Sequence, residues 1–513
     1  MLVRSLVAAA AGVLLALAFE PVGWALLIPL CVAGFVWSVR GLSARAAVLP
    51  GLLFGVGFQF VLLWWMRAVG TDAYLAISAV EAAFFGILGP LTAVVTRWRG
   101  WPIWAAAAWL GVEVWRSSWP FSGMPWGRLS FASADIPVAG AMPYLSANGV
   151  SLLLALLGTG LLWAALQIRA RPIQGTLAIA PLVALVAVPV VTPYHLRPEG
   201  TIQVAAVQGN VPGDGSDILL DHRQVTRNLR DATVELAHRI AAGTAPRPDF
   251  VLWPENSTAV DPFTDATVNA TIQEASRAIG LPILVGGMVR APDPGQVMNQ
   301  GIVWDPVTGP GDRYTKRHPV PFGEYIPWRD KVFPSNFGKL REIPYDMLSG
   351  TRKAPLHIGG VLVADSICFD VAYDDGLYDQ VAGGAQLLVQ QTSNALYVYT
   401  VQPDQQFEIT RLRALETARA TAIASPNGIS GMVDPSGRVL QRAPRRTQDV
   451  LEQELPLSTA ITPAVRLGPW LGRGALLATA VMVGIAMVGG YRRRGTPTAT
   501  TEGPLPVLVG SDR

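Results

Sequence analysis

Eight long apolar stretches constrain this chain of 513 residues more than any other feature. They run approximately over residues 5–19, 21–39, 47–66, 73–96, 101–115, 147–168, 173–192 and 473–491. A helix needs about 20 apolar residues to cross the hydrocarbon of a bilayer, and most of these stretches approach or reach that length. Only 15% of the residues are charged, against about 25% in a typical soluble domain. The sequence therefore predicts a membrane bundle of about eight transmembrane helices.

The distribution of arginine between the short loops predicts the orientation of these helices. If the N-terminus is cytoplasmic, the inward segments hold Arg4, Arg40, Arg45, Arg97, Arg99, Arg169, Arg171, Arg492, Arg493 and Arg494, whereas the outward short loops hold only Arg67, Arg116 and Arg128. Cytoplasmic loops carry the excess of basic residues in membrane proteins. We therefore expect a multi-pass protein of the cell membrane, with both termini cytoplasmic and the long polar interval outside.

These boundaries divide the chain into four segments. They are a seven-helix transmembrane domain (1–195), an extracytoplasmic domain (196–460), a C-terminal transmembrane helix (461–494) and a disordered cytoplasmic tail (495–513). In the second segment, β-rich runs at 202–207, 250–253, 283–287, 301–304, 361–364, 386–390 and 421–425 alternate with helical patterns at 221–242, 266–279 and 404–419. This alternation predicts an α/β domain. The interval 306–357 is rich in turn residues, and we expect long loops there.

Several polar and aromatic residues lie close to the apolar stretches. Glu81 and Glu113 would be costly in lipid without partners, and we expect Glu113 to pair with Arg116 one turn later. Neither carboxylate is expected to be catalytic. The loop 116–146 is rich in Trp, Pro and Gly, which is typical either of a lipid entrance or of an aromatic belt at the membrane surface. The formal net charge of +3 is too small and dispersed to indicate a nucleic-acid partner.

Two charged residues, Glu255 and Lys316, occupy positions typical of a reaction site. Glu255 follows the run 250–253 and Pro254, at a strand end of the kind where α/β proteins build their sites. Lys316 is one of only four lysines among 40 Lys and Arg residues. It precedes a segment that contains Glu324 and three prolines within nine residues, which restrict the backbone. We expect His318, in the same segment, to be a structural hydrogen-bond donor.

Cys368 is the candidate nucleophile, because Cys31 lies in an apolar run and is expected to be a buried hydrophobic residue. Cys368 ends a predicted strand, and in such a turn the backbone N–H of the next residue, Phe369, points at a developing oxyanion. A nearby ammonium favours the thiolate and a carboxylate can take the thiol proton. Glu255, Lys316 and Cys368 therefore form a coherent set. Because the sequence has no His/Cys cluster with ligand spacing, we expect neither a metal nor another cofactor.

The order Trp253-Pro-Glu255, then Lys316 with Pro-Phe-Gly-Glu324, then Cys368 resembles the Glu-Lys-Cys triad of the nitrilase superfamily. With seven apolar stretches before the outward domain and one after it, the chain resembles the bacterial apolipoprotein N-acyltransferase family. The similarity extends from Ala18-Phe-Glu-Pro to the last apolar stretch, and includes Arg413-Ala-Leu-Glu416 and Asn427-Gly428.

This resemblance implies an αββα sandwich and a location in the bacterial inner membrane. It also implies that Glu255 is the general base, that Lys316 stabilises the tetrahedral oxyanion and that Cys368 is the nucleophile. Glu324 would orient Lys316 or Cys368. The implied reaction is ping-pong and needs no cofactor. A membrane phospholipid donates an acyl group to the cysteine as a thioester, and the N-terminal amine of a diacylated apolipoprotein accepts it.

Two departures from the family pattern accompany these matches. Phe369-Asp370 stands where family members often have Tyr-Glu, and Ser393-Asn394-Ala395-Leu396 stands for a Ser-Asn-Asp-Trp pattern. We expect both to affect the preference for donor or acceptor. A membrane-tethered amidase that hydrolyses a small amide would share the triad, but it would admit water and would not need seven helices. A transporter or scaffold would require more facing charges within the helices than Glu81 and Glu113 provide.

Overall fold

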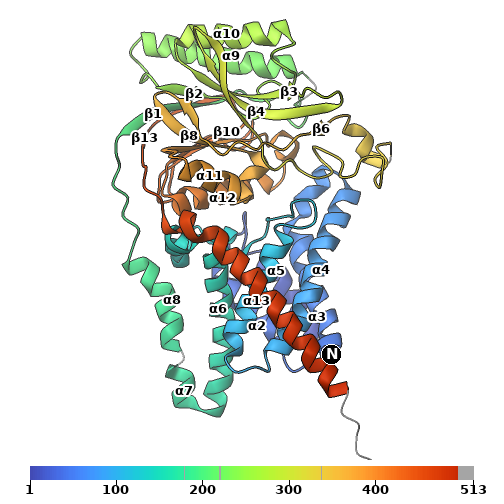
Figure 1. Ribbon diagram of the computed structural model, residues 1–513. Helices are drawn as coiled ribbons and strands as arrows, with labels where there is room; N and C mark the ends of the chain where they lie inside the picture. The colour runs from blue at the N-terminus through green and yellow to red at the C-terminus, as the bar shows by residue number, and fades with distance from the viewer. Residues whose placement is uncertain (178, 219–220, 337, 495–513) are drawn as a thin grey trace, which may run out of the picture.

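The computed structural model describes residues 1–494 except 178, 219–220 and 337. Figure 1 shows a helical bundle that contains the N-terminal residues, with an α/β domain stacked on one of its ends. The tail predicted for residues 495–513 lies outside the described residues.

Helices occupy the apolar stretches of the sequence. They are α1 (Leu2–Ala16), α2 (Ile28–Val39), α3 (Ala44–Leu62), α4 (Thr71–Val95), α5 (Trp101–Arg116), α6 (Met142–Ala170), α7 (Pro172–Leu177), α8 (Ile179–Val191) and α13 (Pro463–Arg494). Five helical segments of the described chain are long and apolar enough to cross a membrane, namely Ala44–Leu62, Thr71–Val95, Pro137–Ala170, Pro172–Val191 and Pro463–Val488. The helices at Leu2–Ala16 and Ala25–Val39 are apolar but shorter. The count of about eight crossings therefore stays a prediction.

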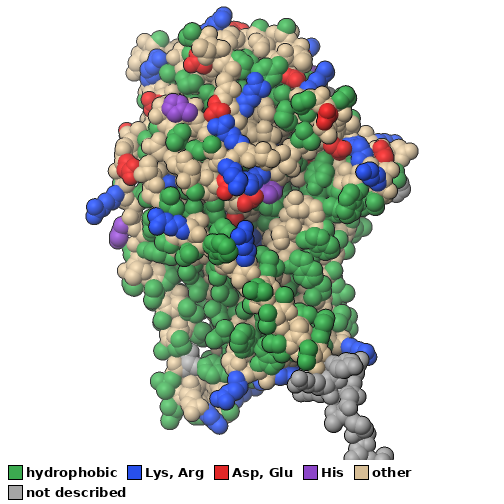
Figure 2. Space-filling model, viewed as in Figure 1, with side chains coloured by type: hydrophobic (Ala, Val, Ile, Leu, Met, Phe, Trp, Pro, Cys, Tyr) green, Lys and Arg blue, Asp and Glu red, His purple; other side chains and the backbone are tan. Residues whose placement is uncertain are grey.

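Small residues allow the helices of the bundle to pack closely. A Cβ atom on Gly51 of α3 would lie 2.5 Å from the carbonyl oxygen of Phe85 in α4, and one on Gly12 of α1 would lie 2.1 Å from that of Phe54 in α3. Such contacts bring backbones together where lipid provides no hydrophobic driving force for association. Figure 2 shows apolar side chains over the sides of the bundle and a group of basic ones at its end away from the α/β domain.

The buried charges at the upper end of the bundle pair differently from the sequence-based prediction. Arg116 does not bind Glu113. Its Nη1 atom lies 2.9 Å from Oε2 of Glu81 on α4 and donates to the carbonyl oxygens of Met124 and Trp126. Glu113 instead accepts the backbone N–H of Leu129 at 3.0 Å. The prediction was wrong because the returning loop brings carbonyl and N–H groups to both side chains, which spacing along one helix cannot reveal.

The α/β domain consists of two mixed sheets packed face to face. The strands are β1 (Thr201–Gln208), β2 (Phe250–Leu252), β3 (Ile283–Arg290), β4 (Gln296–Asp305), β5 (Gly309–Thr315), β6 (Asp346–Met347), β7 (Leu356–Ile358), β8 (Val361–Ile367), β9 (Leu387–Gln391), β10 (Thr421–Ala424), β11 (Gly431–Val433), β12 (Val439–Arg442) and β13 (Asp449–Pro456). One sheet has the order β13-β1-β2-β3-β4-β5, with β6 beside β4, and the other has the order β12-β11-β10-β9-β8-β7.

Helices cover the outer faces of both sheets, which gives the αββα sandwich that the resemblance implied. Helices α9 (His222–Ala241) and α10 (Ala266–Ile279) lie on the first sheet, away from the bundle (Figure 1). Helices α11 (Asp375–Ala382) and α12 (Gln402–Thr417) lie between the second sheet and the bundle. The apolar core between the sheets includes Val204, Leu252, Val363 and Val389.

The interval 306–357 is more ordered than the sequence suggested, because it contains β5, β6 and β7. The expectation of long loops was therefore wrong for these residues. A tight hairpin joins β4 to β5, in which Asp305 accepts the N–H groups of Val307 and Thr308, and Gly309 has a φ of +77°. Glycine adopts this left-handed conformation without strain. Lys316 consequently follows the last residue of a strand.

Buried ion pairs fasten the sandwich to the bundle. Arg413 of α12 lies 2.8 Å from Asp374 and 2.5 Å from Glu416. Arg128, in the loop after α5, also pairs with Asp374 at 2.8 Å, and Glu416 accepts the N–H of Ala147 in α6 at 2.7 Å. Because removal of one partner would leave an uncompensated buried charge, such a network resists separation of its two sides.

Candidate active site

Cys368 lies at the sharp turn where β8 ends. It begins the 3-10 helix η6 (Cys368–Ala372) with a φ of +52°, a region that non-glycine residues rarely adopt. The side-chain amide of Gln390 on the neighbouring strand donates to the carbonyl oxygen of Cys368 at 3.0 Å. As the second residue of the 3-10 helix, Phe369 has an N–H group with no acceptor inside that helix. No hydrogen bond among the described residues occupies this N–H group, so the turn presents a backbone donor beside the thiol.

Glu255 follows the end of β2, as the sequence predicted. Its side chain is 3% exposed and is held by three donors. Oε1 accepts a hydrogen bond from Nδ2 of Asn299 at 2.7 Å and lies 3.3 Å from Nζ of Lys316. Oε2 accepts a hydrogen bond from the backbone N–H of Ser393 at 2.7 Å. These contacts come from both sheets, so the carboxylate is fixed at the edge where the two sheets meet.

Lys316 is fully buried between two carboxylates. Its backbone N–H donates to the carbonyl oxygen of Asn299 at 2.8 Å, which continues the pairing of β5 with β4. Its Nζ lies 3.3 Å from Oε1 of Glu255 and 2.6 Å from Oε1 of Glu324. Oε2 of Glu324 accepts the N–H of Val320 at 2.8 Å. Of the two partners that the sequence left open for Glu324, the described contacts are with Lys316.

The charges of these residues act on one another. Burial disfavours the Lys316 ammonium, but Glu255 and Glu324 outweigh this effect and hold its pKa well above the ordinary value. Burial raises the pKa of Glu324, with Lys316 opposing. Burial and the Glu255 carboxylate raise the pKa of the Cys368 thiol to about 12, although Lys316 lowers it. The resting sulfur is therefore a thiol, and it needs a base at the moment of attack.

Asp370, noted above as a departure from the family pattern, links the cysteine turn to the lysine segment. Its carboxylate accepts the backbone N–H groups of Arg317 and His318 at 3.1 and 2.7 Å and the hydroxyl of Tyr314 at 3.1 Å. The side chain of His318 stacks on Tyr373 with ring centroids 3.8 Å apart and lies 2.7 Å from Asp375. These contacts agree with the structural role expected for His318.

Several residues of the site were missed in the sequence. Asn299 and the N–H of Ser393 hold Glu255, and Gln390 holds the cysteine turn. Tyr397, in the 3-10 helix η7 (Ala395–Tyr397), lies close enough to Cys368 for their charges to interact, and burial raises its pKa. No local signal marked Asn299, because its strand β4 also carries the polar residues Gln296, Gln300 and Asp305.

The loop after α5 covers the cysteine turn. Trp126 is 2% exposed, and its ring stacks on that of Phe369 with centroids 6.0 Å apart. The indole N–H groups of Trp126 and Trp65 both donate to Oε1 of Gln405, at 2.8 and 3.1 Å. Trp126 is thus part of the protein interior and not of an aromatic belt, whereas Trp119 is 59% exposed.

A cavity of about 540 Å³ lies between α1, α3, the start of α4 and α12. Its lining is largely apolar and consists of Ala16, Leu17, Phe19, Glu20, Pro21, Val22, Phe60, Val61, Leu62, Trp64, Tyr74, Val401 and Gln405. Gln405 belongs both to this lining and to the contacts of Trp126, so Gln405 and Trp126 connect the cavity to the cysteine turn.

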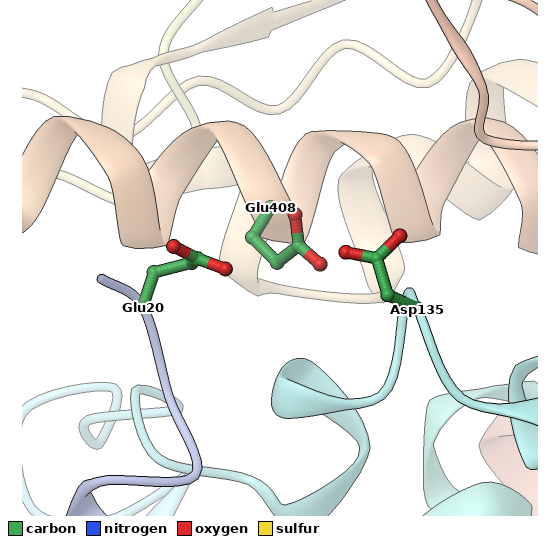
Figure 3. Close-up of side chains that lie close together, drawn as sticks. All are labelled: Glu20, Asp135 and Glu408. Carbon is green, nitrogen blue, oxygen red and sulfur yellow. The ribbon is translucent and has the colours of Figure 1, made fainter. Parts of the chain in front are cut away.

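Three carboxylates meet beside this region, from three distant parts of the chain (Figure 3). Glu20, Asp135 and Glu408 have oxygen atoms within 4.8 Å of one another. Arg411 pairs with Asp135 at 2.7 Å and with Glu408 at 2.8 Å. Burial raises the pKa of Glu408 to about 7, with Arg411 opposing. The arginine neutralises much of the charge, and the cluster joins the bundle to α12.

Both parts of the chain are similar to known protein families. The sequence model of the apolipoprotein N-acyltransferase N-terminal domain matches residues 11–160, and that of carbon-nitrogen hydrolase matches residues 203–462. An apolipoprotein N-acyltransferase of Mycolicibacterium smegmatis is 34% identical over 93% of this chain and 83% of its own length. One of Photobacterium profundum is 26% identical, over 91% and 92%.

A solved structure of an amidase of the nitrilase superfamily from Nesterenkonia sp. AN1 is 18% identical, with a TM-score of 0.35, and covers 51% of this chain and 94% of its own. The sequence relatives carry the assignment, since they extend through the bundle as well as the sandwich. Because such similarity runs along nearly the whole chain, and the two matched segments cover both of its parts, this chain belongs to the apolipoprotein N-acyltransferase family.

Proposed function

We propose that this acyltransferase moves a fatty acyl group from a membrane phospholipid to the N-terminal amine of a diacylglyceryl-cysteine in lipoproteins, through a thioester on Cys368. The observation that carries the mechanism is the buried Lys316 ammonium, held between Glu255 and Glu324 beside the thiol. An apolipoprotein acceptor is supported by the names of the relatives.

In the first half-reaction, Sγ of Cys368 attacks the ester carbonyl carbon while Glu255 accepts the thiol proton. The Lys316 ammonium and the N–H of Phe369 stabilise the negative oxygen of the tetrahedral intermediate. Its collapse breaks the bond between the carbonyl carbon and the glycerol oxygen. Glu255 returns the proton to that oxygen, which releases a lysophospholipid and leaves the acyl group as a thioester.

In the second half-reaction, the amine of the acceptor attacks the thioester carbonyl and Glu255 accepts a proton from its nitrogen. The same two donors stabilise the second oxyanion. Collapse breaks the carbon–sulfur bond, and the proton passes from Glu255 to the departing sulfur. The products are an amide and the free thiol, so one carboxylate acts as base and then acid in each half-reaction.

The cavity beside α12 supports a lipid donor. Its volume of about 540 Å³ and its largely apolar lining suit an acyl chain, and it shares Gln405 with the contacts of Trp126, which stacks on Phe369. Hydrophobic lining with few polar groups is typical of lipid and small-molecule sites. These features favour the acyltransferase over a membrane-tethered amidase, for which an apolar cavity among helices has no evident use.

We further propose the division into segments 1–195, 196–460 and 461–494, with the sandwich outside the cytoplasm of a bacterial cell. The arginine pattern of the short loops supports this orientation, and so do the basic side chains at the far end of the bundle (Figure 2). In intact cells we expect a membrane-impermeant thiol reagent to label Cys368, as measured by mass spectrometry after purification. Labelling that requires lysis of the cells would contradict this orientation, and a Cys368→Ala variant controls for the second cysteine.

The ping-pong scheme predicts an acyl-enzyme in the absence of acceptor. Incubation of the purified protein with phospholipid labelled in its acyl chains should add one acyl group to the peptide containing Cys368, because the first half-reaction needs no amine. Intact-mass and peptide mass spectrometry would detect the adduct, and hydroxylamine should remove it as it does other thioesters. Glu255→Gln is the matched variant, since it keeps the shape of the side chain but cannot accept the proton.

We expect Glu255→Gln to form the adduct about 100- to 10,000-fold more slowly, which is the usual contribution of a positioned base. A wild-type protein that modifies the acceptor but shows no adduct would contradict the thioester. Release of free fatty acid at the rate of acyl transfer, with the acceptor present, would instead favour a hydrolase.

A further inference from the structure

A second carboxyl group, that of Asp365, lies in the apolar core three residues before Cys368. Its side chain is fully buried and shares the inner face of β8 with Val363 and Ile367. Neither of its oxygens accepts a hydrogen bond of good geometry from the described residues. A charged carboxylate in such a place costs far more than a neutral one. Burial, together with Asp370 and Glu255, raises the pKa of Asp365 well above its ordinary value, against the N–H of Ser366.

Gln391, the last residue of β9, is the diagonal neighbour of Asp365 on the same face of the sheet, because the register pairs Asp365 with Val389 and Ile367 with Gln391. Its Nε2 donates across the sandwich to the carbonyl oxygens of Trp253 at 2.6 Å and of Leu284 at 3.4 Å, which fixes the orientation of the amide. Its Oε1 atom therefore points the other way, and it too has no donor among the described residues. A buried acceptor without a donor is costly, so this atom requires one nearby.

Oδ2 of Asp365 and Oε1 of Gln391 both lie next to Gly301 on β4. A Cβ atom at Gly301 would lie 2.0 Å from Oδ2 of Asp365 and 2.6 Å from Oε1 of Gln391. Two oxygens placed side by side repel each other unless one carries a proton. The amide of Gln391 is committed to two carbonyl groups, so a proton shared by the two oxygens would have to be the acid proton of Asp365.

We infer that Asp365 is a positioning residue of the reaction centre: as a neutral acid it holds Gln391, and through the carbonyl of Trp253 it fixes the strand end that presents Glu255. Trp253 is separated from Glu255 only by Pro254, and Gln391 is one of the links between the sheet that carries Cys368 and the sheet that carries Glu255. The inference rests on the proposed roles of Glu255 and Cys368. Asp365 and Gln391 together set the position of the Glu255 carboxylate relative to the Cys368 thiol.

The test compares Asp365→Val, Asp365→Asn and Val363→Ala in the full-length protein in detergent. Valine removes the donor but fills similar space, asparagine keeps a donor, and Val363→Ala disturbs the same face of the same strand without touching a polar group. Two rates are measured: acylation of Cys368 by labelled phospholipid in a single turnover, and alkylation of Cys368 by iodoacetamide at pH 9, followed by peptide mass spectrometry.

We expect Asp365→Val to slow acylation by about 100-fold, the effect of misplacing a reacting group by about 1 Å. Alkylation should instead become faster, because the Glu255 carboxylate raises the pKa of the thiol and its displacement removes that effect. The rate rises about tenfold for each unit by which the pKa falls. The melting temperature should fall, because valine leaves the buried Oε1 atom of Gln391 without its donor. Asp365→Asn should keep both rates within about threefold of the wild type, because the amide of asparagine can still donate to Gln391.

Wild-type acylation and alkylation rates in Asp365→Val would overturn the inference. So would an Asp365→Asn protein as impaired as the valine variant, or a Val363→Ala protein with the same opposite changes in the two rates. A wild-type protein that is never acylated by phospholipid would contradict the proposed function, while the alkylation comparison would still decide the role of Asp365.

Discussion

We expect the replacement of Cys368 by alanine to lower the rate of acyl transfer by at least about 10⁴-fold. No other thiol can take its place, because Cys31 is buried in the bundle, where it is 3% exposed. The substitution removes only the sulfur, with its interaction with Thr392, and it keeps the hydrogen bond from Gln390 to the carbonyl group. The melting temperature should therefore change little, and the loss would be chemical.

The measurement is N-terminal acylation of a reporter lipoprotein, read by mass spectrometry in cells that depend on this enzyme. Cys31→Ala is the matched control and should retain activity. Cys368→Ser tests the chemistry further, because a hydroxyl in the same place is a much poorer nucleophile at neutral pH than a thiol. Acylation that persists in Cys368→Ala would exclude the thioester route.

Replacement of Lys316 by methionine should have the second largest effect, and it should act on both rate and stability. The loss of one oxyanion donor typically costs about 100- to 1,000-fold in rate. Removal of one partner from a buried ion pair typically costs about 3 to 5 kcal/mol in the free energy of unfolding. Both carboxylates, Glu255 and Glu324, would lose the ammonium that they now share. Single-turnover acylation and thermal unfolding in detergent measure the two effects.

Further variants separate these two effects. The double variant Lys316→Met with Glu324→Gln should regain part of the lost stability, because it removes one of the two unpaired charges, but none of the activity. Lys353→Met is the matched control: this lysine is exposed and its nearest carboxylate, Asp379, is 3.7 Å away, so little change is expected. A Lys316→Met protein that acylates at the wild-type rate would contradict the assignment of Lys316 to the oxyanion.

The strand ends that carry the reacting groups could be predicted from the sequence, because their signals are local. A hydrophobic run that stops at Pro254 marks the end of β2, and Cys368 directly follows the run that forms β8. The boundaries of α10 could be predicted as well, since Asp265 caps its first turn and Gly280 ends it. Periodicity and capping act over a few residues, so one sequence contains them.

The contacts between distant residues could not be predicted in this way. The carboxylate of Glu255 is held by Asn299, on β4, and by Ser393, which follows β9 of the other sheet, and Arg116 pairs with Glu81 instead of Glu113. Such pairings depend on how the sheets and the returning loop pack, which local patterns do not encode. The hairpin from β4 to β5 was missed for a different reason: its residues are mostly polar or glycine, so the alternation that marks a strand is absent.

The buried ion pairs that join Arg413 and Arg128 to Asp374 have a consequence for substrate choice. Because any movement of the α/β domain relative to the bundle would separate these ion pairs, the sulfur of Cys368 is held at a fixed height above the ends of the helices. If the donor is a phospholipid, its ester must reach the height of the sulfur, because the α/β domain does not move towards the bundle. In the proposed reaction, selection among phospholipids would therefore depend on the depth of the ester carbonyl in the leaflet as well as on the shape of the lipid.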